Sequence, residues 1–167
     1  MSYLRWYGIW KPRLKVVNTP KPPHNDTVSQ IAFVSVTTDV ISVRALSDLV
    51  SSHSAGAVVT FSGDVRDNDH GRAVTSLEYE AHPAAQSVLE KVAAAIAEKY
   101  EIERLAVAHR HGPIPIGESA LVACVSAKHR DQAFLACQEL VDEVKIQIPI
   151  WKHQVFADGT DEWVNCA

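Results

Sequence analysis

The chain has 167 residues, of which 47% are hydrophobic and 22% charged, and its formal net charge is −4. This length and composition suit one globular domain with its own hydrophobic core. No apolar run is long enough to span a bilayer and no segment has the pattern of a secretory signal, so we expect a cytoplasmic protein that does not bind membranes. The acidic balance disfavours nucleic-acid binding, and an anionic ligand would therefore need a local cluster of basic residues.

Residues 1–28 are predicted to form an N-terminal extension, and residues 29–167 the folded domain. The extension contains four of the eight prolines and has five basic residues against one acidic residue. Its stretch TPKPPHND cannot continue a helix or a central strand. We expect this segment to be flexible.

Within the domain, hydrophobic periodicity predicts strands with helices between them. The predicted strands are 31–37, 56–65, 74–82, 104–112, 118–128 and 150–157, and the predicted helices are 43–51, 85–96 and 131–146. Strand 74–82 alternates apolar and polar residues, and it should pair back on 56–65 as a long hairpin because a polar, turn-forming loop joins the two. This order indicates an α+β sandwich with a largely antiparallel sheet and helices on one face.

The three cysteines, Cys124, Cys137 and Cys166, are widely spaced along the chain. An odd count without a C-x-x-C pair argues against both a disulfide framework and a zinc site. Cys124 lies in an apolar strand and Cys137 on an apolar helix face, so both should be core residues. None of the three has a neighbouring base, and we expect no catalytic cysteine.

Two lysines, Lys145 and Lys152, flank Pro149 near the end of the chain. Each has a simple structural explanation: Lys145 would complement the dipole at a helix C-terminus, and Lys152 would protect an edge strand from aggregation. Their setting favours function instead, because IPIWK is an apolar run. A lysine beside poorly solvated surface is a usable proton donor, acceptor or nucleophile.

Other basic residues also follow or precede predicted elements. Arg66 ends a strand, where it could clamp a phosphate or simply be solvated. His129 and Arg130 precede a helix, and two cations at a helix start oppose the dipole unless an anion binds there. The His-Arg-His run at 109–111 allows metal ligation, but no carboxylate or cysteine companion is evident and we predict no metal.

Five motifs occur in order along the domain: GAVVTFSGDVR, LEYEAHP, HRHG followed by IPIGE, VSAKHRDQAF, and VKIQIPIWKHQ with DGTDEWV. Together they resemble the large, catalytic subunit of molybdopterin synthase, the MoaE family. The match extends over residues 31–164. The resemblance implies an α/β hammerhead-type fold, mostly antiparallel, with an added small antiparallel β subdomain.

The resemblance also implies a reaction, with no cofactor. Family members form homodimers, and each protomer binds a small ubiquitin-like sulfur-carrier subunit, giving a heterotetramer. The C-terminal Gly-Gly thiocarboxylate of that subunit enters a pocket of the large subunit. Two sulfurs then pass to cyclic pyranopterin monophosphate (precursor Z), which becomes molybdopterin. The sulfur arrives on the partner, so no cysteine of the large subunit has to be catalytic.

By motif position, the resemblance implies that Lys145 and Lys152 are catalytic and that Arg66, His129 and Arg130 bind the substrate phosphate and pterin. Lys145 would lie beside the incoming C-terminus of the partner. Lys152 would assist proton transfer as sulfur replaces oxygen.

The chain departs from the family pattern at His153 and Asp64, two positions that are often basic in relatives. Two other functions also fit the sequence. One is a binding module that docks a ubiquitin-like tail without catalysis. The other is an enzyme that acts on a different small anion without a protein partner.

Overall fold

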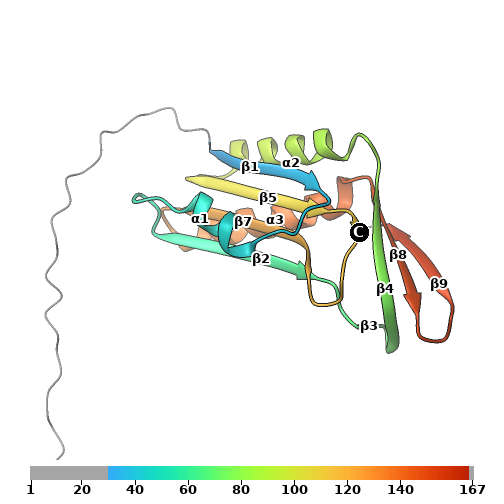
Figure 1. The fold of residues 1–167 in the computed structure, drawn as a ribbon. Helices are drawn as coiled ribbons and strands as arrows, with labels where there is room; N and C mark the ends of the chain where they lie inside the picture. The colour runs from blue at the N-terminus through green and yellow to red at the C-terminus, as the bar shows by residue number, and fades with distance from the viewer. Residues whose placement is uncertain (1–29, 166–167) are drawn as a thin grey trace, which may run out of the picture.

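The computed structural model describes residues 30–165. The predicted N-terminal extension, residues 1–28, lies outside the described residues, and so does Cys166. The described chain forms two β-sheets and three helices (Figure 1). No helix in this part of the chain is long and apolar enough to cross a membrane.

The first sheet has four strands in the order β1-β5-β7-β2. Its strands, in this order, are β1 (Ile31–Thr37), β5 (Arg104–Arg110), β7 (Ser119–Ala127) and β2 (Ala57–Asp64). The pairing of β1 with β5 is parallel, and the other two pairings are antiparallel. β1 and β2 are therefore the two edge strands of this sheet.

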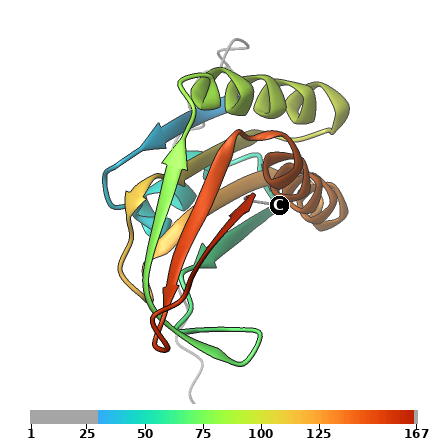
Figure 2. The ribbon, with the colours of Figure 1, turned by 90° about the vertical axis from the view of Figure 1, so that its right-hand side faces the viewer.

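The second sheet follows the order β3-β4-β8-β9, and β6 also pairs with β4. Its strands are β3 (Asn68–Asp69), β4 (Arg72–Ala81), β6 (Gly112–Pro113), β8 (Ile150–Phe156) and β9 (Asp161–Asn165). All its pairings are antiparallel. β4, β8 and β9 run across one end of the first sheet (Figures 1 and 2). The expected α+β fold, mostly antiparallel and with a small antiparallel subdomain, is confirmed.

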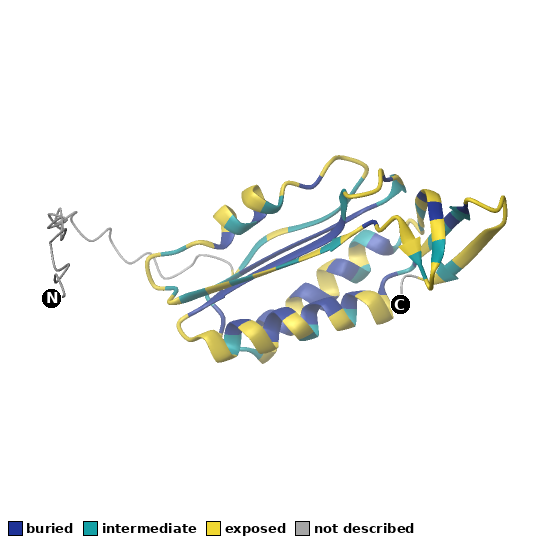
Figure 3. Cartoon of the chain, turned by 90° about the horizontal axis from the view of Figure 1, so that it is seen from below, coloured by how far each residue is buried: buried dark blue, intermediate teal, exposed yellow. Residues whose placement is uncertain are grey.

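Helices cover both faces of the first sheet (Figure 3). They are α1 (Val43–Val50), α2 (Ala85–Lys99) and α3 (Arg130–Gln147). α2 and α3 pack on one face, where Leu89 and Leu140 are fully buried, and α1 packs on the other through Val50. The expectation of helices on one face only was wrong. β5 and β7 are buried almost throughout, and such continuous apolar strands need cover on both faces.

The predicted hairpin between residues 56–65 and 74–82 does not form. β2 pairs instead with β7, where Phe61 lies opposite Ala123, and β4 pairs with β8, where Tyr79 lies opposite Lys152. The connection between them crosses from one sheet to the other. Apolar and polar alternation identifies a strand and its buried face, but any strand with a matching face satisfies it, so the neighbour was not specified.

The expected core positions of two cysteines are confirmed. Cys124 and Cys137 are buried and have free thiols. Burial raises the pKa of both thiols, that of Cys137 to about 11. Cys137 lies on the buried face of α3, and Cys124 lies on β7 in the cluster beneath α1.

Candidate functional site

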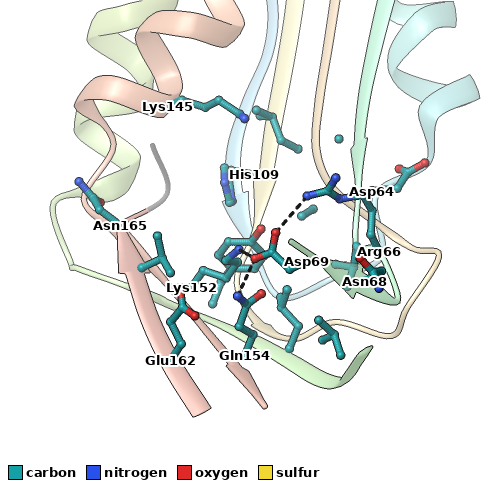
Figure 4. A pocket seen from close by; sticks show the side chains of 18 of the residues that line it. Asp64, Arg66, Asn68, Asp69, His109, Lys145, Lys152, Gln154, Glu162 and Asn165 are labelled. Atoms are coloured by element: carbon teal, nitrogen blue, oxygen red, sulfur yellow. Dashed lines mark hydrogen bonds and ion pairs between the residues drawn. The ribbon is translucent and has the colours of Figure 1, made fainter. Parts of the chain in front are cut away.

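A cavity of about 560 Å³ lies where the two sheets meet. The first sheet contributes the ends of β2 and β5 and the start of β7, and the last turn of α3 adds Lys145. The second sheet contributes inward-facing side chains of β4, β8 and β9 (Figure 4). This volume is in the range of small-molecule binding sites.

Strand β8 places Lys152 and Gln154 on the cavity side, because residues two apart on a strand share a face. Both side chains donate to the same oxygen of Asp69: Lys152 Nζ lies 3.3 Å and Gln154 Nε2 lies 2.7 Å from Asp69 Oδ2. The Lys152 side chain is 21% exposed and that of Asp69 18%. Lys152, which was predicted to lie beside poorly solvated surface, is thus partly buried and paired with Asp69.

Arg66 approaches the same carboxylate from the loop after β2. Its Nη2 lies 3.4 Å from Asp69 Oδ1, although the Arg66 side chain is 74% exposed. Asp69 thus holds two cations and one amide (Figure 4). The hydrogen bond from Gln154 is the main cause that lowers the pKa of Asp69, and Lys152 adds to it against the opposing effect of burial.

Lys145 and His109 lie on another side of the cavity (Figure 4). The Lys145 side chain makes no hydrogen bond or ion pair with another residue of the described range. His109 is 1% exposed, and its ring packs edge-on against Tyr79 with the ring centroids 5.4 Å apart. Its Nδ1 lies 2.9 Å from the carbonyl oxygen of Arg110, which can only accept, so Nδ1 carries the proton.

The His109 imidazole is neutral at physiological pH. Burial is the main cause that lowers its pKa from 6.5 to about 4; the charges of His111 and Lys145 contribute to the decrease, and the hydrogen bond to Arg110 opposes it. The His-Arg-His run therefore contributes a neutral, cavity-lining histidine. Across residues 30–165, no group of three or more His, Cys, Asp or Glu side chains could hold a metal ion.

Two of the five predicted site residues do not line this cavity. His129 caps the N-terminus of α3 without a side-chain capping bond, and the 82% exposed Arg130 lies 3.7 Å from Asp131. Lys145 stands at the opposite end of the same helix. At 1.5 Å per residue, the two ends are about 22 Å apart. A single chain therefore brings together Arg66, Lys145 and Lys152 only.

The cavity is less basic than the sequence suggested. Its three cations are accompanied by three carboxylates, Asp64, Asp69 and Glu162. Asp64 accepts hydrogen bonds from Ser62 at 2.6 Å and Ser119 at 2.8 Å, and these hydrogen bonds lower its pKa. Asp69 is the one carboxylate that bonds to cavity cations within the described residues.

Sequence reasoning missed Asp69 and Gln154 and considered His109 only as a metal ligand. Gln154 could have been found, since it shares a strand face with Lys152. The turn at Gly71, whose φ is +83°, was recognisable as a polar loop. The polar-loop pattern did not reveal that Asp69 points into the cavity, because the direction of this side chain depends on the pairing of β3 with β4.

Comparisons with known proteins all indicate one family. Residues 36–147 match the family model described as MoaE protein. Two curated relatives, both named molybdopterin synthase catalytic subunit, are from Arabidopsis thaliana and Aspergillus fumigatus. The first is 42% identical over 113 residues, which are 67% of this chain and 57% of that protein. The second is 35% identical over 163 residues, covering 91% of this chain and 87% of the relative.

A solved structure also has this fold. The crystal structure of molybdopterin synthase from Staphylococcus aureus aligns with a TM-score of 0.71 at 31% identity. The alignment covers 77% of this chain and 94% of that chain. The match therefore includes nearly all of the solved protein.

Proposed function

The chain belongs to the MoaE protein family, and from this premise we propose that it is the catalytic subunit of a molybdopterin synthase. It would convert precursor Z to molybdopterin by transferring two sulfurs from the thiocarboxylated C-terminus of a small ubiquitin-like subunit. The observation that carries the proposal is the cavity between the two sheets, which gathers Lys145, Lys152 and Arg66 from three separate elements. A phosphate-bearing substrate and an anionic thiocarboxylate both require such cations.

The two lysines take different roles in this proposal. Lys152 is held in a defined place by Asp69, which suits proton transfer to and from the reacting oxygen as sulfur replaces it. Lys145 extends from the exposed end of α3 beside the cavity, where it can pair with the incoming C-terminal thiocarboxylate. Arg66 is the mostly exposed cation at the edge of the cavity and would bind the substrate phosphate.

His129 and Arg130 enter the proposal through a second copy of the chain. β2 is an edge strand, and across residues 30–165 no strand pairs with its outer side. If two β2 strands pair antiparallel about a twofold axis, the start of one lies beside the end of the other. β2 starts beside the end of β7, which leads into α3, since Gly56 N donates to Ala127 O at 3.0 Å, and it ends at the cavity. Each copy's His129–Arg130 segment would then face the other copy's cavity.

Mixing two inactive variants tests this composite site. In heterodimers of Lys152→Ala and Arg130→Ala chains, one cavity carries both changes and the other carries neither. When equal amounts are mixed and the subunits exchange randomly, half the dimers are heterodimers, and each of these holds one intact cavity of its two. A quarter of all cavities are then intact, so about a quarter of the wild-type rate should return. A single-chain site predicts no recovery at all, and a monomer by light scattering would equally contradict the dimer.

The catalytic role is tested with purified chain, precursor Z and a thiocarboxylated small subunit. Lys152→Ala should lower molybdopterin formation by about 100-fold or more, because a positioned acid–base group contributes that much. Lys145→Ala should lower it by a similar factor, because a cation placed beside reacting negative charge contributes about as much. Both variants should still co-elute with the small subunit. Lys91→Ala, an exposed lysine on α2 outside the cavity, is the matched control.

The outcome separates the proposal from its rivals. A binding module without catalysis predicts that the lysine variants lose the small subunit, with no separate chemical defect. An enzyme that acts on another anion without a protein partner predicts no dithiolene product even from the wild type. Either result would overturn the proposed function.

A further inference from the structure

We propose that Asp69 is an internal counter-anion of the cavity, a positioning residue that occupies the cations until an anionic ligand replaces it. This inference rests on the anion-binding function proposed above and adds to it a residue that limits which anions can enter. It is argued from the geometry of the β3–β4 turn and from the set of bonds that Asp69 makes.

The turn between β3 and β4 is built to point Asp69 inward. His70 and Gly71 both have positive φ, +49° and +83°, which is the backbone of a tight hairpin turn. Asn68 accepts a hydrogen bond from Gly71 N at 3.0 Å, and Asp69 pairs with Arg72 across the turn. The Asp69 side chain therefore leaves a rigid hairpin rather than a loose loop.

Arg72 fixes this hairpin to the second sheet. Its guanidinium lies 3.5 Å from the ring centroid of Phe156, and its Nη2 lies 3.3 Å from Asp158 Oδ2. Ala157 N also donates to Ala73 O at 2.9 Å. The hairpin backbone is thus anchored to the second sheet by contacts other than those of Asp69 with Lys152 and Arg66.

Asp69 uses both carboxylate oxygens on the groups that an incoming anion would need. Oδ2 accepts from Lys152 at 3.3 Å and Gln154 at 2.7 Å, and Oδ1 lies 3.4 Å from Arg66. A phosphate oxygen would seek the same donors in the same arrangement. An anion that binds to these donors of Lys152 and Arg66 must therefore displace Asp69 from at least one of the two cations. Its apparent affinity is then lowered by the fraction of time that these cations are available.

This arrangement favours ligands that have other binding groups as well. Inorganic phosphate has nothing to offset the displaced carboxylate, whereas a pterin phosphate or a protein C-terminus brings further contacts. Asp64 serves as a comparison inside the same cavity, because its oxygen is held by Ser62 and Ser119 rather than by cations. Removal of its charge leaves the cations as they are.

Phosphate binding by the full chain, measured by calorimetry at fixed ionic strength, tests the inference. Asp69→Asn should bind inorganic phosphate about tenfold more tightly than the wild type, which corresponds to cations that are available about a tenth of the time. Asp69→Glu, which keeps the charge, should remain within about threefold of the wild type, and so should Asp64→Asn. Asp69→Ser is a second variant in case Asp69→Asn does not fold, and thermal unfolding monitors all four.

Three results would overturn the inference: unchanged or weaker phosphate binding in both folded neutral variants, an equal gain in Asp64→Asn, or an equal gain in Asp69→Glu. The second would mean that net charge alone controls binding. In the molybdopterin assay, Asp69→Asn should lower both KM and kcat, because the substrate binds more easily and Lys152 loses its orientation. A gain in phosphate binding together with a wild type that makes no molybdopterin would refute the proposed function and leave this inference standing.

Discussion

A decrease in pH from 7 to 5 should destabilise this protein through His109, because its side chain is buried and neutral. Burial lowers its pKa from 6.5 to about 4 in the folded state. Between these two values the unfolded chain binds a proton that the folded chain does not, so stability falls as the pH decreases through this window. The loss begins near pH 6.5 and is complete near pH 4.

The expected size follows from the two pKa values. At pH 5 the unfolded histidine is almost fully protonated and the folded one about a tenth protonated, so His109 lowers the free energy of unfolding by about 2 kcal/mol relative to pH 7. Urea unfolding at the two pH values, followed by circular dichroism, measures this difference. His109→Gln removes the titrating group and should reduce the pH-dependent loss by about the same 2 kcal/mol.

The control is His129→Gln, which removes an exposed histidine at the start of α3. It tests whether the replacement of any histidine by glutamine changes the pH dependence. If His109→Gln loses as much stability between pH 7 and pH 5 as the wild type does, His109 is not the group responsible. An NMR titration of His109 itself in the folded state with a midpoint near 6.5 would refute the reasoning directly.

Two further predictions concern groups that the proposed chemistry does not use. In a Cys166→Ser background, Cys124 and Cys137 should resist iodoacetamide at pH 8 in the native protein and react after unfolding, because burial keeps both thiols protonated. Rapid labelling of the folded chain, detected by mass spectrometry, would contradict this. Glu118→Gln should lower the free energy of unfolding, measured in urea, by about 1–3 kcal/mol, since it leaves the buried Arg110 guanidinium without its carboxylate partner. A change below about 0.5 kcal/mol would show that the pair contributes no more than an ordinary surface contact.

Much of the local structure could be predicted from the sequence, because it depends on neighbouring residues. The helix predicted at 131–146 is observed as α3, Arg130–Gln147, and the strand predicted at 31–37 is β1. Their apolar residues recur at the spacing that each element requires. What failed was the choice of partner for 74–82, since β8 lies far along the chain and no local pattern refers to it.

The candidate site was predictable to the same extent. Lys145 and Lys152 flank a helix end and the turn at Pro149, so their presence in one cavity follows from local geometry. Asp69 comes from a distant segment, and its contact with Lys152 exists only after the two sheets are formed. The chain also separates His129 and Arg130 from the cavity along a rigid helix, which a list of basic residues does not reveal.

The pairing of β4 with β8 has a consequence for how the protein is made. Asp69 and Lys152 are 83 residues apart, so the cavity is closed by a contact between distant parts of the chain. Closure of such long loops is slow, and during synthesis β8 leaves the ribosome after every strand of the first sheet. A nascent or truncated chain that ends before β8 lacks Lys152, so it can fold much of its core before the cations of the cavity are assembled. The cavity would be complete only once the last strands have docked.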